Sequence, residues 1–142
     1  MERLEENLFY TLEKAVKAYR QFVQRNLTAA GLDITLDQWL VLKTIVQESE
    51  STQQQIAAKV FKDVASVTRI VEILVSKGLL ERVFLPSDRR RQQLVVTKSG
   101  EEILEKVYPV SLGNRKAALD GIAAESIENV ESILQSIIKN VN

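Results

Sequence analysis

Thr52 to Gly78 reads TQQQIAAKVFKDVASVTRIVEILVSKG. Thr52 followed by Gln55 forms a capping box, the pattern with which many helices begin. Asp63 is a good N-cap for a second helix over residues 64–77, and Gly78 suits the left-handed conformation that ends one. The stretch therefore predicts two short helices joined by a brief turn.

The second of these helices has two different faces. On a helical wheel its apolar residues fall in one arc: Val64, Val67, Ile70, Val71 and Leu74. The other side carries polar or short side chains: Lys62, Ala65, Ser66, Thr68, Arg69, Glu72 and Ser76. Ile73 is the one large apolar residue on that side. Short side chains allow close approach to base edges, and an arginine can bind phosphate or guanine. The face suits a DNA recognition helix, although Ser66 and Thr68 equally fit an ordinary solvent-exposed surface.

The chain after Gly78 favours strands. Two β-branched or apolar runs, residues 79–84 and 93–97, flank the charged segment 86–91. This pattern predicts a β-hairpin with a charged tip. Arg89, Arg90 and Arg91 in that tip could enter a narrow minor groove, or the triplet could simply be a solvated surface.

Amphipathic helices are expected on both sides of this region. Apolar residues recur at helical spacing over residues 4–27, a length of roughly 36 Å. A second capping box opens a helix at Thr35, and Thr97 caps a further helix that Pro109 should kink or break. A last helix begins near Ala123. The fold class is therefore mainly α with a small β-hairpin.

The distribution of charge is uneven although the total is zero. The chain has 142 residues, with 19 basic and 19 acidic side chains. The net charge is −2 over residues 1–50, +5 over 51–100 and −3 over 101–142. The positive field therefore coincides with the elements that are shaped to fit a DNA groove.

The composition excludes several classes of chemistry. The chain has no cysteine and no histidine, which removes disulfides, thiolate nucleophiles, tetrahedral zinc sites and imidazole bases. We expect no cofactor, no metal and no enzymatic activity. Because neither a secretory signal nor a run of eighteen apolar residues is evident, we expect a cytoplasmic protein that does not enter a membrane.

Several short motifs follow one another in a set order. They are Ile56-Ala57, Asp63-x-x-Ser66-Val67-Thr68-Arg69, Lys77-Gly78-Leu79, Asp88-Arg89-Arg90 and Leu94-x-x-Thr97-x-x-Gly100. In this order and spacing they resemble the MarR family of bacterial winged-helix transcriptional regulators over nearly the whole chain. Two residues depart from the family pattern, since Leu85 stands where an acidic residue is frequent and Arg91 where a small one is common.

The resemblance implies roles for particular residues. It places Ala65, Ser66, Thr68 and Arg69 in the major groove and Arg90 at the wing tip in the minor groove. Asp63 would either pair with that arginine or act as a plain N-cap. The resemblance also implies a single domain over residues 1–142, with a winged-helix DNA-binding lobe at 33–100 and dimerisation helices at 1–32 and 101–142.

The apolar seams of the terminal helices predict a homodimer, because such stripes would be exposed in a monomer. The residues expected in the interface are Leu8, Leu12, Val130, Leu134 and Ile137. Two-fold symmetry would place the recognition helices roughly 34 Å apart, so we expect a pseudo-palindromic operator in double-stranded DNA and repression by steric exclusion of polymerase.

A small-molecule effector, or none, fits this scheme. A ligand bound where the dimerisation helices meet the lobe would act by favouring a dimer with wrongly spaced recognition helices. The aromatic residues that could line such a pocket, or pack as ordinary core, are Phe9, Tyr10, Tyr19, Phe22 and Trp39. The rival interpretation is a winged-helix protein-interaction module whose basic tip docks on an acidic partner in place of DNA.

Overall fold

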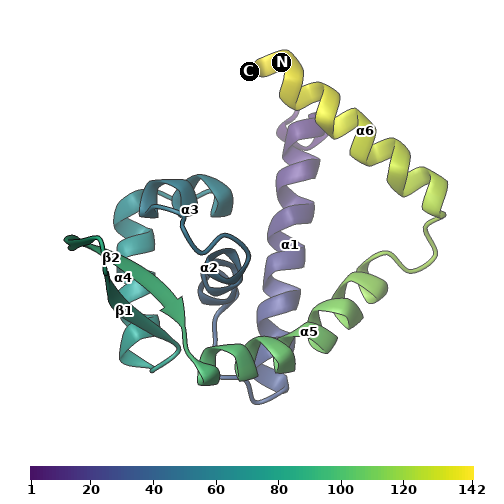
Figure 1. Ribbon diagram of the computed structural model, residues 1–142. Helices are drawn as coiled ribbons and strands as arrows, with labels where there is room; N and C mark the ends of the chain where they lie inside the picture. The colour runs from purple at the N-terminus through teal and green to yellow at the C-terminus, as the bar shows by residue number, and fades with distance from the viewer.

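The computed structural model describes residues 1–142, apart from the side chain of Arg89. Over these residues the chain is mainly helical and has one two-stranded antiparallel sheet, as Figure 1 shows. The elements in chain order are η1 (Leu4–Glu6), α1 (Leu8–Ala29), α2 (Leu36–Gln47), α3 (Gln53–Val60), α4 (Val64–Ser76), β1 (Leu80–Leu85), β2 (Asp88–Val96), α5 (Lys98–Ala118) and α6 (Ala124–Val141). This is a winged helix-turn-helix with long terminal helices, as predicted.

The molecule consists of a compact lobe and two long arms. Helices α2 to α4 and the β1–β2 hairpin form the lobe, which lies on one side of α1 (Figure 1). Helix α5 leads away from the hairpin and contacts α1, while α6 lies on the far side of α1 from the lobe. No residue of α6 is buried among those that the structure describes.

The predicted helix starts are confirmed by their hydrogen bonds. The Thr35 hydroxyl accepts from the Gln38 amide at 3.1 Å, and the Gln38 side chain accepts from the Thr35 amide at 3.2 Å. The same reciprocal pair joins Thr52 and Gln55 at 3.2 and 2.9 Å. Each capping box satisfies two backbone N–H groups that a helix start would otherwise leave without a partner.

Three local expectations were wrong. Helix α1 begins at Leu8, because the Asn7 side chain accepts from the Phe9 amide and leaves residues 4–6 as a separate 3₁₀ turn. Of the kink or break expected at Pro109, the break does not occur, because α5 continues through this residue. Pro109 and Glu105 are both exposed, so water can bind the carbonyl that lacks its helical donor. Val64 is 42% exposed rather than part of the buried face.

The hairpin also differs from the expected wing tip. Its register pairs Leu80 with Val96 and Arg82 with Leu94, and shifts between Phe84 and Leu85. The turn consists of residues 86–87 and β2 begins at Asp88, so the arginine triplet belongs to the strand, at the register irregularity between the Leu85–Asp88 and Phe84–Gln92 pairs. Proline and serine favour a tight turn, which places Leu85 opposite Asp88.

The core lies inside the lobe and at its contact with α1 and α5. Its most completely buried large side chains come from α1 to α5 and β1: Leu27, Val41, Leu42, Ile56, Val67, Val71, Leu74, Leu80 and Val107. Gly100 lets the start of α5 pack closely against Leu79, the residue before β1, since a Cβ at this position would lie 2.4 Å from the Leu79 carbonyl oxygen. The lobe is therefore a packed unit that holds α4 and the hairpin in one fixed arrangement.

Candidate nucleic-acid interface

On its outer face, helix α4 carries two exposed side chains and two hydroxyl groups that are hydrogen-bonded within the protein. Ala65 and Arg69 are exposed. The Ser66 hydroxyl donates to Oδ2 of Asp63 at 3.1 Å. The Thr68 hydroxyl lies 2.6 Å from Oε1 of Gln53 and 2.9 Å from the Val64 carbonyl. Thr68 thus joins α4 to the start of α3, while Ala65 and Arg69 remain available to a ligand.

Asp63 is the N-cap of α4. Its Oδ1 accepts from the Ser66 amide at 2.7 Å, so both of its carboxylate oxygens bind Ser66. These hydrogen bonds, first from the backbone and then from the hydroxyl, hold the pKa of Asp63 below its usual value. No ion pair joins Asp63 to Arg90 or Arg91 among the described side chains. The alternative in which it pairs with a wing arginine is therefore not the arrangement seen.

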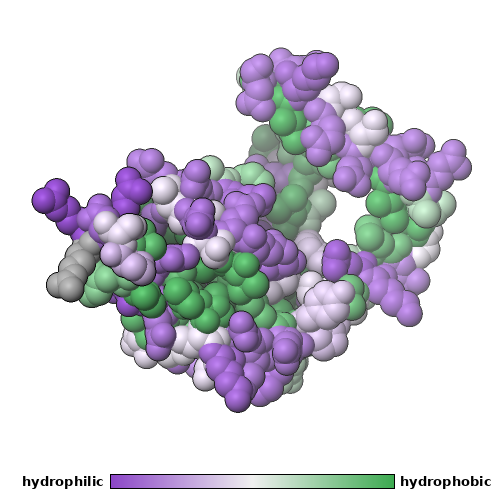
Figure 2. Space-filling view, in the orientation of Figure 1, coloured by the Kyte–Doolittle hydropathy of each residue, from purple (hydrophilic) through white to green (hydrophobic). Residues whose placement is uncertain are grey.

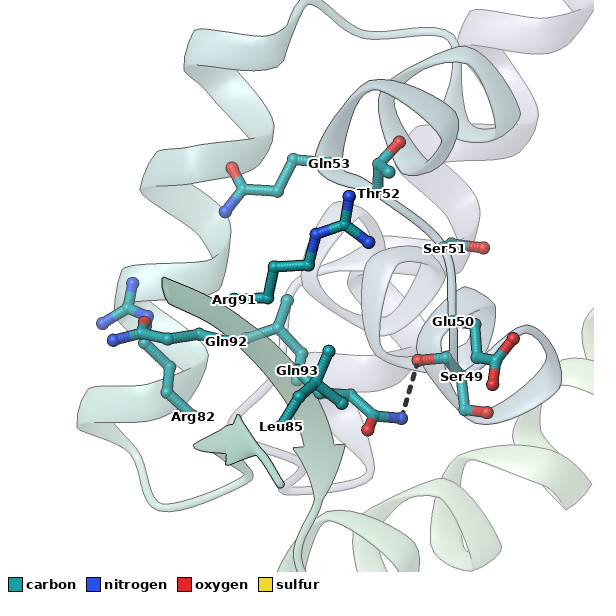
Figure 3. Close-up of a pocket in the computed structure, with 11 residues that line it drawn as sticks. Ser49, Glu50, Ser51, Thr52, Gln53, Arg82, Leu85, Arg91, Gln92 and Gln93 are labelled. Carbon is teal, nitrogen blue, oxygen red and sulfur yellow. Dashed lines mark hydrogen bonds between the residues drawn. The ribbon is translucent and has the colours of Figure 1, made fainter. Parts of the chain in front are cut away.

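A groove of about 640 Å³ separates the wing from the loop that leads into α3. Figure 3 shows Arg91 extending from β2 toward Thr52 and Gln53. The Gln93 side chain of β2 donates to the Ser49 carbonyl at 3.3 Å. This hydrogen bond links the wing to the loop on the other side of the groove. The lining residues are Ser49, Glu50, Ser51, Thr52, Gln53, Arg82, Leu85, Arg91, Gln92, Gln93 and Leu94.

Around α4 and the hairpin, the described lysines form ion pairs whereas the described arginines do not. Lys59 pairs with Glu48 at 3.0 Å, and Lys62 pairs with Asp37 at 3.2 Å. Among the described side chains, Arg69, Arg82, Arg90 and Arg91 take part in no ion pair. The positive charge that is free to meet a ligand is therefore carried by arginine, which binds phosphate with several donors.

The structure adds residues to the predicted set and leaves one outside it. The side chain of Arg89 lies outside the described residues. Arg82 and Gln92 line the groove although sequence reasoning missed both. Their exposed positions on strands were the available signal, because strand side chains alternate between faces. Nothing in the sequence patterns indicated that the loop before α3 would form the other wall.

The predicted interface and effector residues lie on the helices outside the lobe or where these meet it. In the proposed interface set, Leu8 is 56% and Val130 52% exposed, whereas Leu12, Leu134 and Ile137 are half-buried. In the aromatic set, Phe9 is exposed and Tyr10 and Phe22 are half-buried. Tyr19 and Trp39 pack against the core, and Nζ of Lys43 lies 5.4 Å from the centre of the Trp39 ring.

Neither a metal centre nor a membrane-spanning helix is formed by the described part of the chain. Within it, no three acidic, histidine or cysteine residues are grouped so that they could hold a metal ion. No helix formed by the described residues is long and apolar enough to cross a membrane.

Comparison with known proteins identifies this architecture. Residues 34–91 match the MarR family. Similar solved structures include Bordetella bronchiseptica BpsR, whose DNA binding is regulated by 6-hydroxynicotinic acid. BpsR has a TM-score of 0.84 and 18% identity, with 96% of each chain covered.

Two further structures have the same fold. CouR from Rhodococcus jostii, bound to p-coumaroyl-CoA, has a TM-score of 0.80 and 22% identity, covering 96% of this chain and 95% of its own. A mutant MarR from E. coli complexed with operator DNA has a TM-score of 0.82 and 24% identity, with 92% of each chain covered. At these identities the comparisons establish a shared fold over nearly the full length.

Proposed function

We propose that this chain, whose residues 34–91 match the MarR family, is a transcriptional regulator that binds double-stranded DNA. Helix α4 would enter the major groove, where Ala65 is small enough for close approach and Arg69 can reach guanine or phosphate. The observation that carries the proposal is the set of described arginines without ion pairs beside the open face of α4, where the neighbouring Lys59 and Lys62 are already paired.

The groove beside the wing would hold the DNA backbone. Arg91 and Arg82 supply charge from the two strands, and Arg90 lies exposed on the same strand as Arg91. Contacts of this kind fix the position of a protein on the duplex without reading its sequence. Ser66 and Thr68 would act mainly by holding α4 in place, because their hydroxyls are already hydrogen-bonded within the protein.

A homodimer is supported by the apolar faces that α1 and α6 leave uncovered. Figure 2 shows an opening between α1 and the segment formed by α5 and α6, with hydrophobic side chains along its edges. Because one chain does not fill this space, a second copy of the chain would cover it. The symmetric pair would read a pseudo-palindromic operator with half-sites about one helical turn apart and would repress by excluding polymerase.

A small-molecule effector would fit where the terminal helices meet the lobe. Tyr10, Tyr19 and Phe22 lie on α1 and Trp39 on α2, so a ligand among them would contact both parts. Such a ligand can change DNA affinity only if it binds one dimer geometry better than another. BpsR and CouR, which share the fold, are described with small molecules.

The test is selection of random duplex DNA by the purified protein, followed by fluorescence-anisotropy titration at several salt concentrations. We expect a palindromic site bound in about the nanomolar range, with log affinity falling steeply with log salt as counterions are released. Absence of any enriched site, with and without candidate effectors, would favour the protein-interaction module.

Three substitutions assign the contacts. Arg69→Ala should weaken binding about 5- to 100-fold and relax the preference for one base pair. Arg91→Ala and Arg90→Ala should weaken binding on all sequences alike and reduce the salt slope by about 1 for each phosphate that is no longer neutralised. The control is Lys14→Ala, which removes an exposed charge on α1 and should change neither the affinity nor the salt slope. Full affinity in both Arg69→Ala and Arg90→Ala would contradict the assignment.

A further inference from the structure

The turn before α4 holds a bulky residue in a conformation that favours glycine. Phe61 has φ 59° and ψ 42°, and among the described residues it is the one non-glycine with positive φ. The Phe61 and Lys62 amides both donate to the Ala57 carbonyl, which is the hydrogen-bonding pattern of a glycine-ended helix. A phenylalanine here is conformationally unfavourable, because its Cβ crowds the backbone in the left-handed region.

The same side chain contributes nothing to the core. Phe61 is 95% exposed, and Val64, the first residue of α4, is 42% exposed. We refer to these two side chains as the Phe61–Val64 patch. A strained backbone and an unburied aromatic ring at one residue are both costs to folding, and no packing contact offsets them. Violations of local rules without a structural gain are typical of functional sites.

Building on the proposed function, we propose that the Phe61–Val64 patch makes apolar contact with DNA at the entrance to the major groove. Phe61 lies two residues before the N-cap of α4, so a helix that enters the groove by its N-terminus brings this ring to the groove edge. DNA is the partner because Phe61 and Val64 lie just before the exposed Ala65 at the N-terminal end of α4, the end that would enter the groove.

The apolar groups that DNA offers there are the thymine C5-methyl and the deoxyribose. Only the thymine methyl carries sequence information, since it distinguishes thymine from the other bases in the major groove. A contact with thymine would make Phe61 a specificity residue, whereas a contact with deoxyribose would make it a positioning residue. The charged neighbours do not compete for this role, because Asp63 is held by Ser66 and Lys62 by Asp37.

The experiment compares the wild type with Phe61→Gly on the selected duplex and on the same duplex with deoxyuridine in place of thymine. Glycine is the residue that the turn favours, so Phe61→Gly should fold with an equal or higher melting temperature. We expect it to bind the thymine duplex about fourfold more weakly per half-site, the effect of uncovering one methyl-sized group. Its salt slope should equal that of the wild type, because no charge is removed.

Comparing the two duplexes distinguishes a contact with thymine from a contact with deoxyribose. If deoxyuridine weakens the wild type but not Phe61→Gly, the ring contacts thymine methyls. If Phe61→Gly binds more weakly on both duplexes by the same factor, the contact is with deoxyribose. Phe61→Gly that binds both duplexes as tightly as the wild type overturns the inference. That result leaves the proposed function standing, because the function fails only if the wild type itself selects no duplex.

Discussion

Asp37 joins three parts of the molecule through its two carboxylate oxygens. Oδ1 accepts a hydrogen bond from the Arg20 guanidinium on α1, and Oδ2 lies 3.2 Å from Nζ of Lys62 in the turn before α4. Burial alone would raise the pKa of Asp37, but the hydrogen bonds and charges of both cations outweigh it and lower the pKa. This single residue of α2 therefore ties the proposed recognition helix to the long helix α1.

We expect Asp37→Asn to lower the free energy of unfolding by about 1 kcal/mol near pH 7, a modest value because solvent screens these half-exposed charges. The stabilisation is present above about pH 4, where the unfolded carboxyl is ionised. It is lost as the pH falls through the lowered pKa of Asp37 in the folded protein, so the urea-unfolding free energies of variant and wild type should approach each other as the pH is reduced below about 4.

Asp33→Asn provides the matched control for that measurement. Asp33 also pairs with a lysine, Lys77, at 3.4 Å, but its side chain is 95% exposed. We expect Asp33→Asn to lower the free energy of unfolding by less than half as much as Asp37→Asn does, because an exposed ion pair contributes little to stability. Equal stability of the Asp37→Asn protein and the wild type at pH 7 would refute the coupling.

At the scale of elements, the packing of the start of α5 against Leu79, just before β1, and against the end of β2 depends on one glycine. A methyl group on Gly100 would lie 2.4 Å from a backbone oxygen and 2.7 Å from the Val96 side chain, so α5 would have to shift. Gly100→Ala should therefore destabilise the protein by about 1–3 kcal/mol in denaturant unfolding. Gly113→Ala in the same helix meets nothing within 4 Å and should be neutral or stabilise by up to about 1 kcal/mol.

The two glycine variants must be compared at one protein concentration, because association would add to apparent stability. If both variants lose stability equally, helix propensity or oligomer contacts and not the close approach to Leu79 would explain the effect. If Gly100→Ala is neutral, the junction between the wing and α5 is more adaptable than its distances indicate.

Elements that are specified locally could be predicted from the sequence, and those that depend on distant partners could not. Thr35, Thr52 and Asp63 were identified as caps because the hydrogen bonds of a cap involve residues within three positions. The exposure of Val64 and the irregular register at the arginines depend on tertiary packing and on how the two strands align. The pairing of Asn26 with the buried Asn114, 88 positions apart, has no local signature.

The same division applies to the candidate site: its locally specified part could be predicted from the sequence, and the part that depends on distant elements could not. The α4 face follows from helical periodicity, which is why the open positions of Ala65 and Arg69 matched expectation. The engagement of Thr68 by Gln53 and the second wall of the wing groove required the relative placement of α3 and the hairpin. Phe61 was missed because its strain and exposure are properties of the folded turn.

At the scale of the whole molecule, α6 is amphipathic, but no residue of it is buried among those that the structure describes. Val130, Ile133 and Ile138 are about half exposed, at 52%, 56% and 49%, and Leu8 on α1 is similarly open. Burial of apolar surface is the main driving force for association, so these faces should be covered in solution by a second copy of the chain. The DNA face should then act as a pair of linked half-sites.

We therefore expect Val130→Asp to dissociate a dimer that the wild type forms at micromolar concentration, as measured by sedimentation velocity. Asn129→Asp adds the same charge at the neighbouring exposed position of α6 and should leave the dimer intact. Since two linked contacts bind about 10²- to 10⁴-fold more tightly than one, the Val130→Asp monomer should bind a full operator no better than a half-site. A monomeric wild type that still binds the palindrome tightly would contradict the dimer.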